Sequence, residues 1–289
     1  MARPTALGRA GRWLLVSAGV LVLFVGYQQW GTALAHWQGQ RDLRAAFTHA
    51  LARAGTHRHG GSPTATAYPA VGDPVGILVI PRIGLDQVVV EGVASAQLAL
   101  GPGHYPGTPL PGQAGNSAVA GHRTTHGAPF NGLAEVQPGD PIEVTTLQGR
   151  FTYRVVRSSV VPPDDIGVLR PSATSQLTLT TCTPKYSAAR RLIVVARLVD
   201  PPAPATPIAV DRPAGATPAS DPVRSPGAWL ELAAAVAALV GLVAGVGALR
   251  RRTASPRLAR AAPWLAVPVG AVLMYLAFAA LDTLLPPTL

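Results

Sequence analysis

The sequence predicts a mostly β domain, folded as a sandwich or a closed barrel, with apolar helices near both ends of the chain. Three observations predict this fold class. Residues 75–199 hold several short runs rich in Val, Ile and Thr, which Gly, Pro, Asn and Asp separate. No long amphipathic pattern interrupts these runs. Charge-poor apolar segments of 18 residues or more lie instead outside them, and such a length crosses a hydrocarbon core of about 30 Å.

The β region contains seven runs with strand-like composition, and one long Gly/Pro-rich loop separates the second run from the third. A helical turn is expected only within 129–140. The seven runs are 75–84, 87–93, 116–122, 140–147, 150–161, 176–182 and 190–199. Together they predict a globular domain over 74–200, which is long enough to bury one core.

The N-terminal part predicts a membrane anchor. Residues 1–12 carry three arginines and are expected in the cytoplasm, and the apolar segment at 13–37 is expected to span the membrane. A cleaved signal peptide is the alternative, but the length of the run favours an uncleaved anchor. Residues 38–73 then form an extracytoplasmic linker, in which 41–54 has the pattern of a short amphipathic helix.

The C-terminal part predicts two more spans. A Pro-rich linker at 201–228 leads to a transmembrane helix at 229–249, a basic loop at 250–263 and a second transmembrane helix at 264–285. Five arginines in the basic loop place it in the cytoplasm. The arginines at 1–12 and 250–263 indicate the same orientation, so the protein is predicted to be a multi-pass membrane protein with its β domain outside the cell.

The net charge of +10 reflects this topology rather than a nucleic-acid surface. Eight of the 24 basic residues flank the apolar segments, and the other sixteen nearly balance the 14 acidic residues. No basic stripe with interleaved aromatic residues is present, which argues against nucleic-acid binding. No Gly-rich phosphate loop is present either, so no nucleotide cofactor is expected.

The chain has a single cysteine, Cys182, which excludes an intramolecular disulfide. Most free cysteines are small buried hydrophobic residues, and that interpretation applies here too. A nucleophile is the other interpretation, because Cys182 ends a strand-like run directly before a Pro-containing turn, a rigid and accessible position.

Three motifs resemble the sortase family of cysteine transpeptidases. "TLTTC" at 178–182 is similar to the family signature TLxTC, and "AVAGHR" at 118–123 is similar to the segment that carries the family's essential histidine. Arg191 begins "RLIV" nine residues after the cysteine, in the context of the essential arginine. The resemblance covers about residues 75–199. It implies a sortase-type closed β-barrel of about eight strands with short helices, and "GHRTTHGAPF" with "TLTTCTP" is most similar to class E sortases of high-GC Gram-positive bacteria.

The resemblance implies acyl transfer without a cofactor. Cys182 is expected to attack the Thr–Gly carbonyl of an LPxTG- or LAxTG-like sorting signal on a surface protein, with His122 as general acid. Arg191 is expected to hold the substrate or stabilise the oxyanion, and strand alternation favours it over Arg190. An amine of a lipid II-like peptidoglycan precursor would then resolve the thioester.

Four further positions are candidate contacts to the substrate or the oxyanion, namely Thr180, Thr181, His126 and Arg123. Backbone N–H groups near the cysteine and the Thr181 hydroxyl are expected to form the oxyanion hole. His126 is expected at the mouth of the site, at a position where class E sortases often have Tyr. Arg123 is expected to pair with a carboxylate or line the wall. No metal site is expected, because no suitable ligand spacing accompanies the histidine pairs.

Three other functions stay open. Class C pilin-polymerising sortases share "GHR" and "TCTP", but residues 55–74 hold no lid motif of an Asp followed by an aromatic residue. L,D-transpeptidases also use Cys and His, but their "SHGC" motif is absent. A non-enzymatic β-domain scaffold tethered to the membrane, with Cys182 in its core, is the third alternative.

Overall fold

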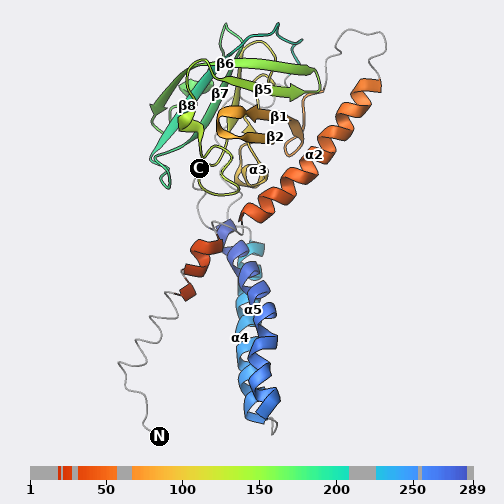
Figure 1. Cartoon of the computed structure of the whole chain (residues 1–289), viewed down its shortest axis with the longest axis vertical. Helices are drawn as coiled ribbons and strands as arrows, with labels where there is room; N and C mark the ends of the chain where they lie inside the picture. Colours follow the sequence, from red (N-terminus) through yellow and green to blue (C-terminus); the bar gives the residue numbers. More distant parts are fainter. Residues whose placement is uncertain are drawn as a thin grey trace. The chain divides into compact units, whose positions relative to one another are not determined.

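The computed structural model describes residues 19–20, 22–27, 32–56, 67–207, 226–252 and 256–284. These residues fall into two compact units (Figure 1). The barrel unit comprises the described residues between 32 and 207. The helical unit comprises residues 19–27 together with the two C-terminal helices.

Eight strands close into a β-barrel, as the sequence predicts. Seven of them overlap the seven predicted runs, with ends that differ by up to two residues where a strand extends beyond its run. The eighth, β3, has two residues and lies in the Gly/Pro-rich segment that we expected to be a loop. Around the barrel the order is β1-β2-β3-β4-β7-β8-β6-β5, and β5 pairs with β1 to close it. The strands are β1 (Pro74–Ile80), β2 (Leu85–Glu91), β3 (Gly103–His104), β4 (Asn116–Ala120), β5 (Pro141–Thr146), β6 (Gly149–Val161), β7 (Gln176–Thr183) and β8 (Arg190–Leu198).

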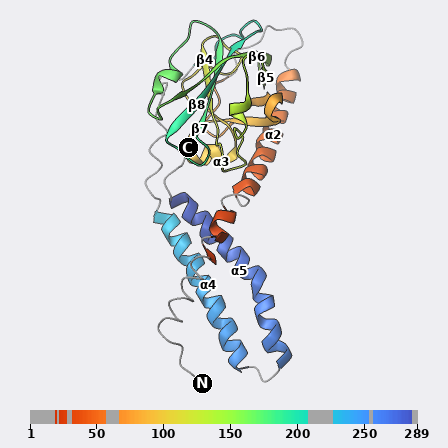
Figure 2. The same ribbon diagram turned by 60° about the vertical axis from the view of Figure 1, so that its left-hand side comes forward.

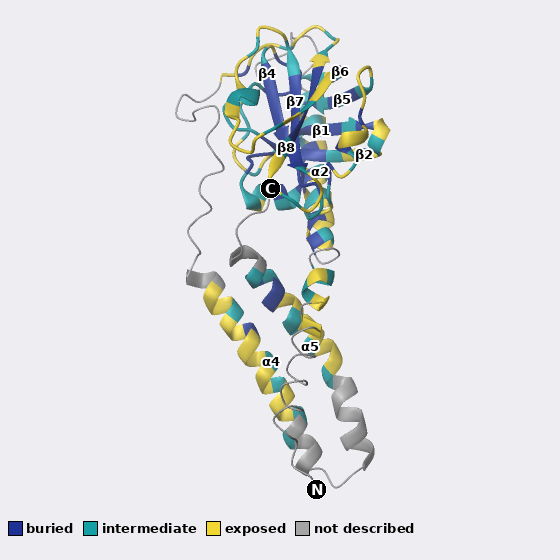
Figure 3. Ribbon diagram, turned by 90° about the vertical axis from the view of Figure 1, so that its left-hand side faces the viewer, coloured by how far each residue is buried: buried dark blue, intermediate teal, exposed yellow. Residues whose placement is uncertain are grey.

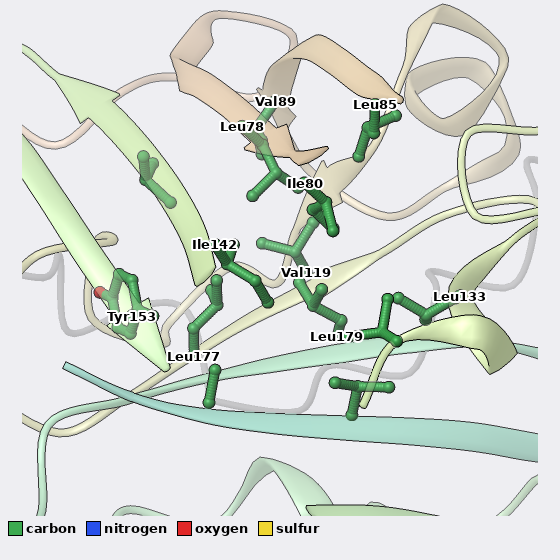
Figure 4. Close-up of a cluster of buried hydrophobic side chains, with 14 of the residues drawn as sticks. Leu78, Ile80, Leu85, Val89, Val119, Leu133, Ile142, Tyr153, Leu177 and Leu179 are labelled. Carbon is green, nitrogen blue, oxygen red and sulfur yellow. The ribbon is translucent and has the colours of Figure 1, made fainter. Parts of the chain in front are cut away.

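One apolar cluster fills the barrel, because alternate residues of each strand point inwards. Leu78, Ile142, Leu177 and Leu179 are completely buried there (Figure 4). Tyr153 is also completely buried, and its hydroxyl accepts a 2.6 Å hydrogen bond from the Gly112 N–H. That bond satisfies the polar end of the ring inside an apolar core.

Short helices connect the strands. They are η2 (Pro81–Ile83), α3 (Ser95–Leu100), η3 (Leu133–Glu135) and η4 (Ile166–Leu169). The helical turn expected within 129–140 is confirmed as η3. The sequence analysis did not predict α3, which is only six residues long and therefore shows little periodicity.

A long helix, α2 (Thr32–Thr56), packs on the outside of the barrel. It contains the helix predicted at 41–54 but begins earlier. Its side chains Leu43 and Phe47 are buried, and Leu43 packs against Val88 and Val90 of β2. Residues 32–37, which we expected at the end of the membrane anchor, therefore belong to the barrel unit. Residues 38–56, expected as part of a linker, are helical as well, because an apolar stripe on α2 finds a partner on the barrel.

The barrel unit also extends beyond 74–200 at both ends. On the N-terminal side, the Tyr68 hydroxyl donates to the Thr108 carbonyl. On the C-terminal side, the Ala203 N–H donates to the Gly112 carbonyl, and Thr206 is buried and hydrogen-bonded to Gln113. The first residues of the predicted Pro-rich linker are thus part of the folded unit. Residues 208–225 lie outside the described residues.

The helical unit contains α4 (Pro226–Arg252) and α5 (Pro256–Leu284), which lie side by side (Figure 2). Phe24 packs edge-on against Phe278 of α5 at a ring-centroid distance of 5.2 Å. Of the helices that the structure describes, only α4 is long and apolar enough to cross a membrane, over Trp229–Val246 with a mean hydropathy of 2.1. The apolar stretch of α5, Ala266–Leu281, is shorter.

Transmembrane helices at both ends are therefore not confirmed. Eleven of the 25 residues of the predicted N-terminal anchor, at 13–18, 21 and 28–31, lie outside the described residues. The predicted loop at 250–263 is helical at 250–252 and at 256–263. Exposed side chains line much of both helices, whereas the strands are mostly buried (Figure 3).

Candidate active site

Cys182 lies near the end of β7, and its side chain is almost fully buried, with 8% exposed. β7 pairs with β4 in parallel on one side and with β8 in antiparallel on the other. Backbone hydrogen bonds on both sides hold the strand, so the position of the thiol is set by a rigid element rather than a loop.

Arg191 faces the thiol from the neighbouring strand. In the β7–β8 register Cys182 is paired with Arg191, and the Arg191 Nη1 lies 3.5 Å from the Cys182 Sγ. The same nitrogen donates to the Ala188 carbonyl at 3.1 Å. Arg190 is exposed on the other face. The choice of Arg191 from strand alternation thus agrees with the geometry.

His122 follows β4 at the same end of the barrel. Ala120 is paired with Thr180, and the Gly121 N–H donates to the Thr180 carbonyl at 3.1 Å. Because β4 and β7 are parallel, the chain that continues from β4 reaches the level of Cys182. His122 is buried there, with 6% exposed, and its ring stacks on the ring of His126 at a centroid distance of 4.9 Å.

Arg123 does not pair with a carboxylate as we expected. Its Nη1 donates to the Cys182 carbonyl at 3.1 Å, and the residue is buried with 8% exposed. A backbone carbonyl can take the place of a carboxylate because the strand end leaves it without a ladder partner. Arg123 therefore ties the segment after β4 to the nucleophile's own backbone.

Thr181 and Thr180 were both candidate contacts to the substrate or the oxyanion. The Thr181 hydroxyl donates to the Gly121 carbonyl at 2.7 Å. Its single proton is engaged in that bond, so Thr181 joins β7 to the histidine segment instead of donating to an oxyanion. Thr180 is buried and lines the pocket beside the thiol.

A pocket opens at the thiol, and Tyr105 forms part of its wall. The sequence analysis did not select this residue. The lining residues are Tyr105, Ala120, Gly121, Thr180, Thr181, Cys182 and Arg191. Burial raises the pKa of the Tyr105 phenol, an effect that Arg191 opposes and Cys182 reinforces. Tyr105 is therefore a neutral hydrogen-bonding group close to both.

His104, the residue before Tyr105, has a structural role. It is completely buried, and its Nδ1 lies 2.7 Å from the Glu91 carboxylate. Its Nε2 faces the Pro109 carbonyl at 3.0 Å, and the Thr108 hydroxyl donates to the Tyr105 carbonyl. A buried, paired network of this kind restrains the backbone that carries the pocket wall.

The charge state of the thiol follows from two opposing effects. Burial raises the pKa of Cys182, whereas the positive charges of Arg191 and Arg123 lower it. Burial is the larger effect, so the resting sulfur is a neutral thiol at neutral pH. The two arginines nevertheless provide positive charge where a thiolate or an oxyanion would form.

In the part of the chain that the structure describes, no group of three or more His, Cys, Asp or Glu side chains could hold a metal ion. His57 and His59 lie outside that part. The pocket brings Cys182, Arg191 and the two threonines together, and Arg123 contacts the Cys182 backbone. His122, with His126 stacked on it, follows the pocket residue Gly121 in the chain but is not among the residues that line the pocket. This set fits nucleophilic acyl transfer.

A family profile described as the sortase domain matches residues 78–199. A solved structure of sortase E1 from Streptomyces coelicolor with a tripeptide in the active site is 32% identical, and the match covers 47% of this chain and 94% of that one, with a TM-score of 0.43. The chain belongs to the sortase family. The family predicted from the motifs around Cys182, His122 and Arg191 is thus confirmed.

Two curated sortases give the same result. Sortase SrtE1 of Streptomyces coelicolor is 34% identical over 206 residues, which cover 65% of this chain and 56% of that protein. Sortase D of Bacillus subtilis is 34% identical over 121 residues, which cover 42% of this chain and 60% of that protein. The chain thus spans about 60% of the length of these curated sortases. The predicted similarity to class E agrees with the first of them.

Proposed function

We propose that this sortase is a cysteine transpeptidase that cleaves a sorting signal of the LPxTG or LAxTG type between Thr and Gly and transfers the protein to a cell-wall amine. The juxtaposition of the Cys182 thiol with the Arg191 guanidinium, 3.5 Å away, carries the proposal. A buried cysteine that only fills space in a core does not require a positively charged neighbour. A nucleophilic cysteine benefits from one, because positive charge favours the thiolate form.

In the first step the Cys182 thiol passes its proton to His122, and the resulting thiolate Sγ attacks the Thr carbonyl carbon, so that a C–S bond forms. The carbonyl oxygen becomes an oxyanion, and Arg191 stabilises it together with backbone N–H groups near the strand end. The tetrahedral intermediate collapses, the C–N bond to Gly breaks, and His122 gives its proton to the leaving amine. A thioester remains on the enzyme.

The second step reverses the first with another amine. The acceptor nitrogen attacks the thioester carbon, His122 takes its proton, and the Cys182 thiolate leaves as the new amide forms. The acceptor is the stem-peptide amine of a lipid II-like peptidoglycan precursor. Arg123, Thr181 and Thr180 hold the strand end and the histidine segment in place, and His126 keeps the His122 ring oriented.

The catalytic unit is anchored in the membrane by several spans, with the barrel outside the cell. The exposed apolar surface of α4 supports this, since Val240 and Val243 are 63% and 67% exposed. Two basic clusters, at 1–12 and 250–263, favour a cytoplasmic location for both segments. The first span is expected to end before Thr32, where α2 begins to pack on the barrel.

The test is a transpeptidation assay with the full chain in detergent micelles, an LAxTG peptide and a glycine amine. We expect a thioester by mass spectrometry and a ligated product, and we expect Cys182→Ala to reduce the rate more than about a thousandfold. Cys182→Ala should leave the Tm nearly unchanged. A wild-type chain that forms neither product would support the scaffold alternative, whereas head-to-tail joining of pilin-like substrates would support the class C-like one.

A further inference from the structure

The turn that follows His122 is unusual in its backbone. Three consecutive residues have left-handed φ values, 49° at His126, 72° at Gly127 and 44° at Ala128. Only glycine adopts this region freely, so the two flanking residues are strained. Hydrogen bonds from the Ala128 N–H to the Thr125 carbonyl and from the Phe130 N–H to the His122 carbonyl close the loop. A strained turn of this kind persists only where its surroundings hold it.

The first two turns of α2 supply part of that support. The Thr32 Oγ1 accepts a hydrogen bond from the His126 N–H at 3.3 Å. The His36 ring packs directly against Gly127, where an added Cβ would lie 2.3 Å from the ring Cδ2. Thr32 and His36 are 2% and 5% exposed. Both side chains therefore contact the turn in a closely packed interface.

The helix that carries these residues is itself fixed on the barrel. The His36 Nδ1 donates to the Ala99 carbonyl at 3.3 Å. The Gln40 amide spans two elements, because it donates to the Val88 and Leu100 carbonyls at 2.9 Å and accepts from the Val88 N–H at 2.8 Å. Several buried contacts thus anchor α2 on both sides of His36, so that it can hold the turn in one place.

The 125–128 turn determines where His126 lies. The His126 ring stacks on the His122 ring with an interplanar angle of 25°. We propose that Thr32 and His36 of α2 are positioning residues for His122, acting through the 125–128 turn and the His126 ring. The first residues of α2 then help to set the geometry of the active site. This inference rests on the proposed function, because it assigns a task to the same histidine.

The first experiment uses the full chain in detergent micelles and measures single-turnover thioester formation on an LAxTG peptide. Thr32→Val keeps the shape and removes the hydroxyl acceptor, and we expect a rate about tenfold lower with an unchanged peptide KM. Thr32→Ser restores the acceptor and should restore the rate. Thr48→Val is the matched control, since Thr48 is exposed on the same helix and its hydroxyl bonds only to the Arg44 carbonyl.

The second experiment tests the contact between helix and turn. Gly127→Ala should slow thioester formation strongly in the wild-type background and less in a His36→Ala background, where the overlapping ring is gone. The inference would be overturned if Gly127→Ala slowed thioester formation by the same factor in both backgrounds, or if Thr32→Val reacted at the wild-type rate. Either result would leave the proposed function intact.

A readout independent of activity keeps the two proposals separate. In a histidine-labelled full chain, Thr32→Val should shift the NMR resonances of the His122 and His126 rings, and neither Thr32→Ser nor Thr48→Val should. If the wild-type chain forms no thioester, the proposed function fails, and these resonances still test the positioning. Unchanged resonances in Thr32→Val would contradict it.

Discussion

The barrel unit and the helical unit use similar residues in opposite ways. Both are rich in Val, Leu and Ala, yet the strands bury these side chains, and α4 exposes them. Leu78 of β1 is completely buried, whereas Val240 of α4 is 63% exposed. A strand has two faces, and the barrel encloses one of them. A helix that is apolar all round has no such inner face and needs an apolar solvent or partner.

The two units therefore contribute different properties to the protein. The barrel unit contains its own apolar core and all the candidate catalytic residues. The helical unit contributes an apolar surface that fits a lipid environment. Separating the two units should therefore separate catalysis from membrane association.

The largest expected effect comes from removing the helical unit. A fragment of residues 32–207 should stay in the supernatant with lipid vesicles, while the full chain sediments with them. The fragment must begin no later than Thr32, because a start at 38 would remove His36. Cys182→Ala in the full chain is the control and should sediment like wild type. Equal sedimentation of fragment and full chain would show that the barrel unit itself binds the membrane.

The next effect contrasts one apolar truncation in each unit. Leu78→Ala should destabilise the barrel by about 2–5 kcal/mol, because it leaves a cavity in a filled core. A Tm lower by roughly 5–15 °C would follow. Val240→Ala in α4 removes an exposed side chain and should change the free energy of unfolding of the barrel by less than about 0.5 kcal/mol. Calorimetry of the full chain in micelles measures both, and similar losses would mean that the units fold together.

The smallest effect concerns charge at the thiol. Burial raises the pKa of Cys182 and Arg191 lowers it, so Arg191→Gln should raise that pKa further. Less thiolate is then present at a given pH. Alkylation by iodoacetamide at pH 8 should slow by about threefold to tenfold, and its pH profile should move to higher pH. The matched control is Arg190→Gln at the exposed neighbour, and an equal effect there would contradict the assignment.

Much of the barrel and of the candidate site could be predicted from local patterns. Alternation marks a strand whatever its neighbours are, and it also selects Arg191 over Arg190. Other features depend on residues far apart in the chain. β3 pairs through only two residues inside a Gly/Pro-rich segment, and Tyr105 reaches the pocket only because β3 and β4 lie together. The partner of Arg123 is a backbone carbonyl, which no side-chain pattern records.

The sequence by itself determined the family, seven of the eight strands and the residue types at the site, because motif spacing and a two-residue period are local properties of the chain. Only the tertiary structure decided that α2 belongs to the barrel unit. Thr32 and His126 are 94 residues apart, and the other residue pairs that join α2 to the barrel are also tens of residues apart in the chain. Their contacts depend on how the folded barrel positions its loops. The contact between the Arg191 guanidinium and the Cys182 thiol is more local, because the register of the neighbouring strands β7 and β8 sets it.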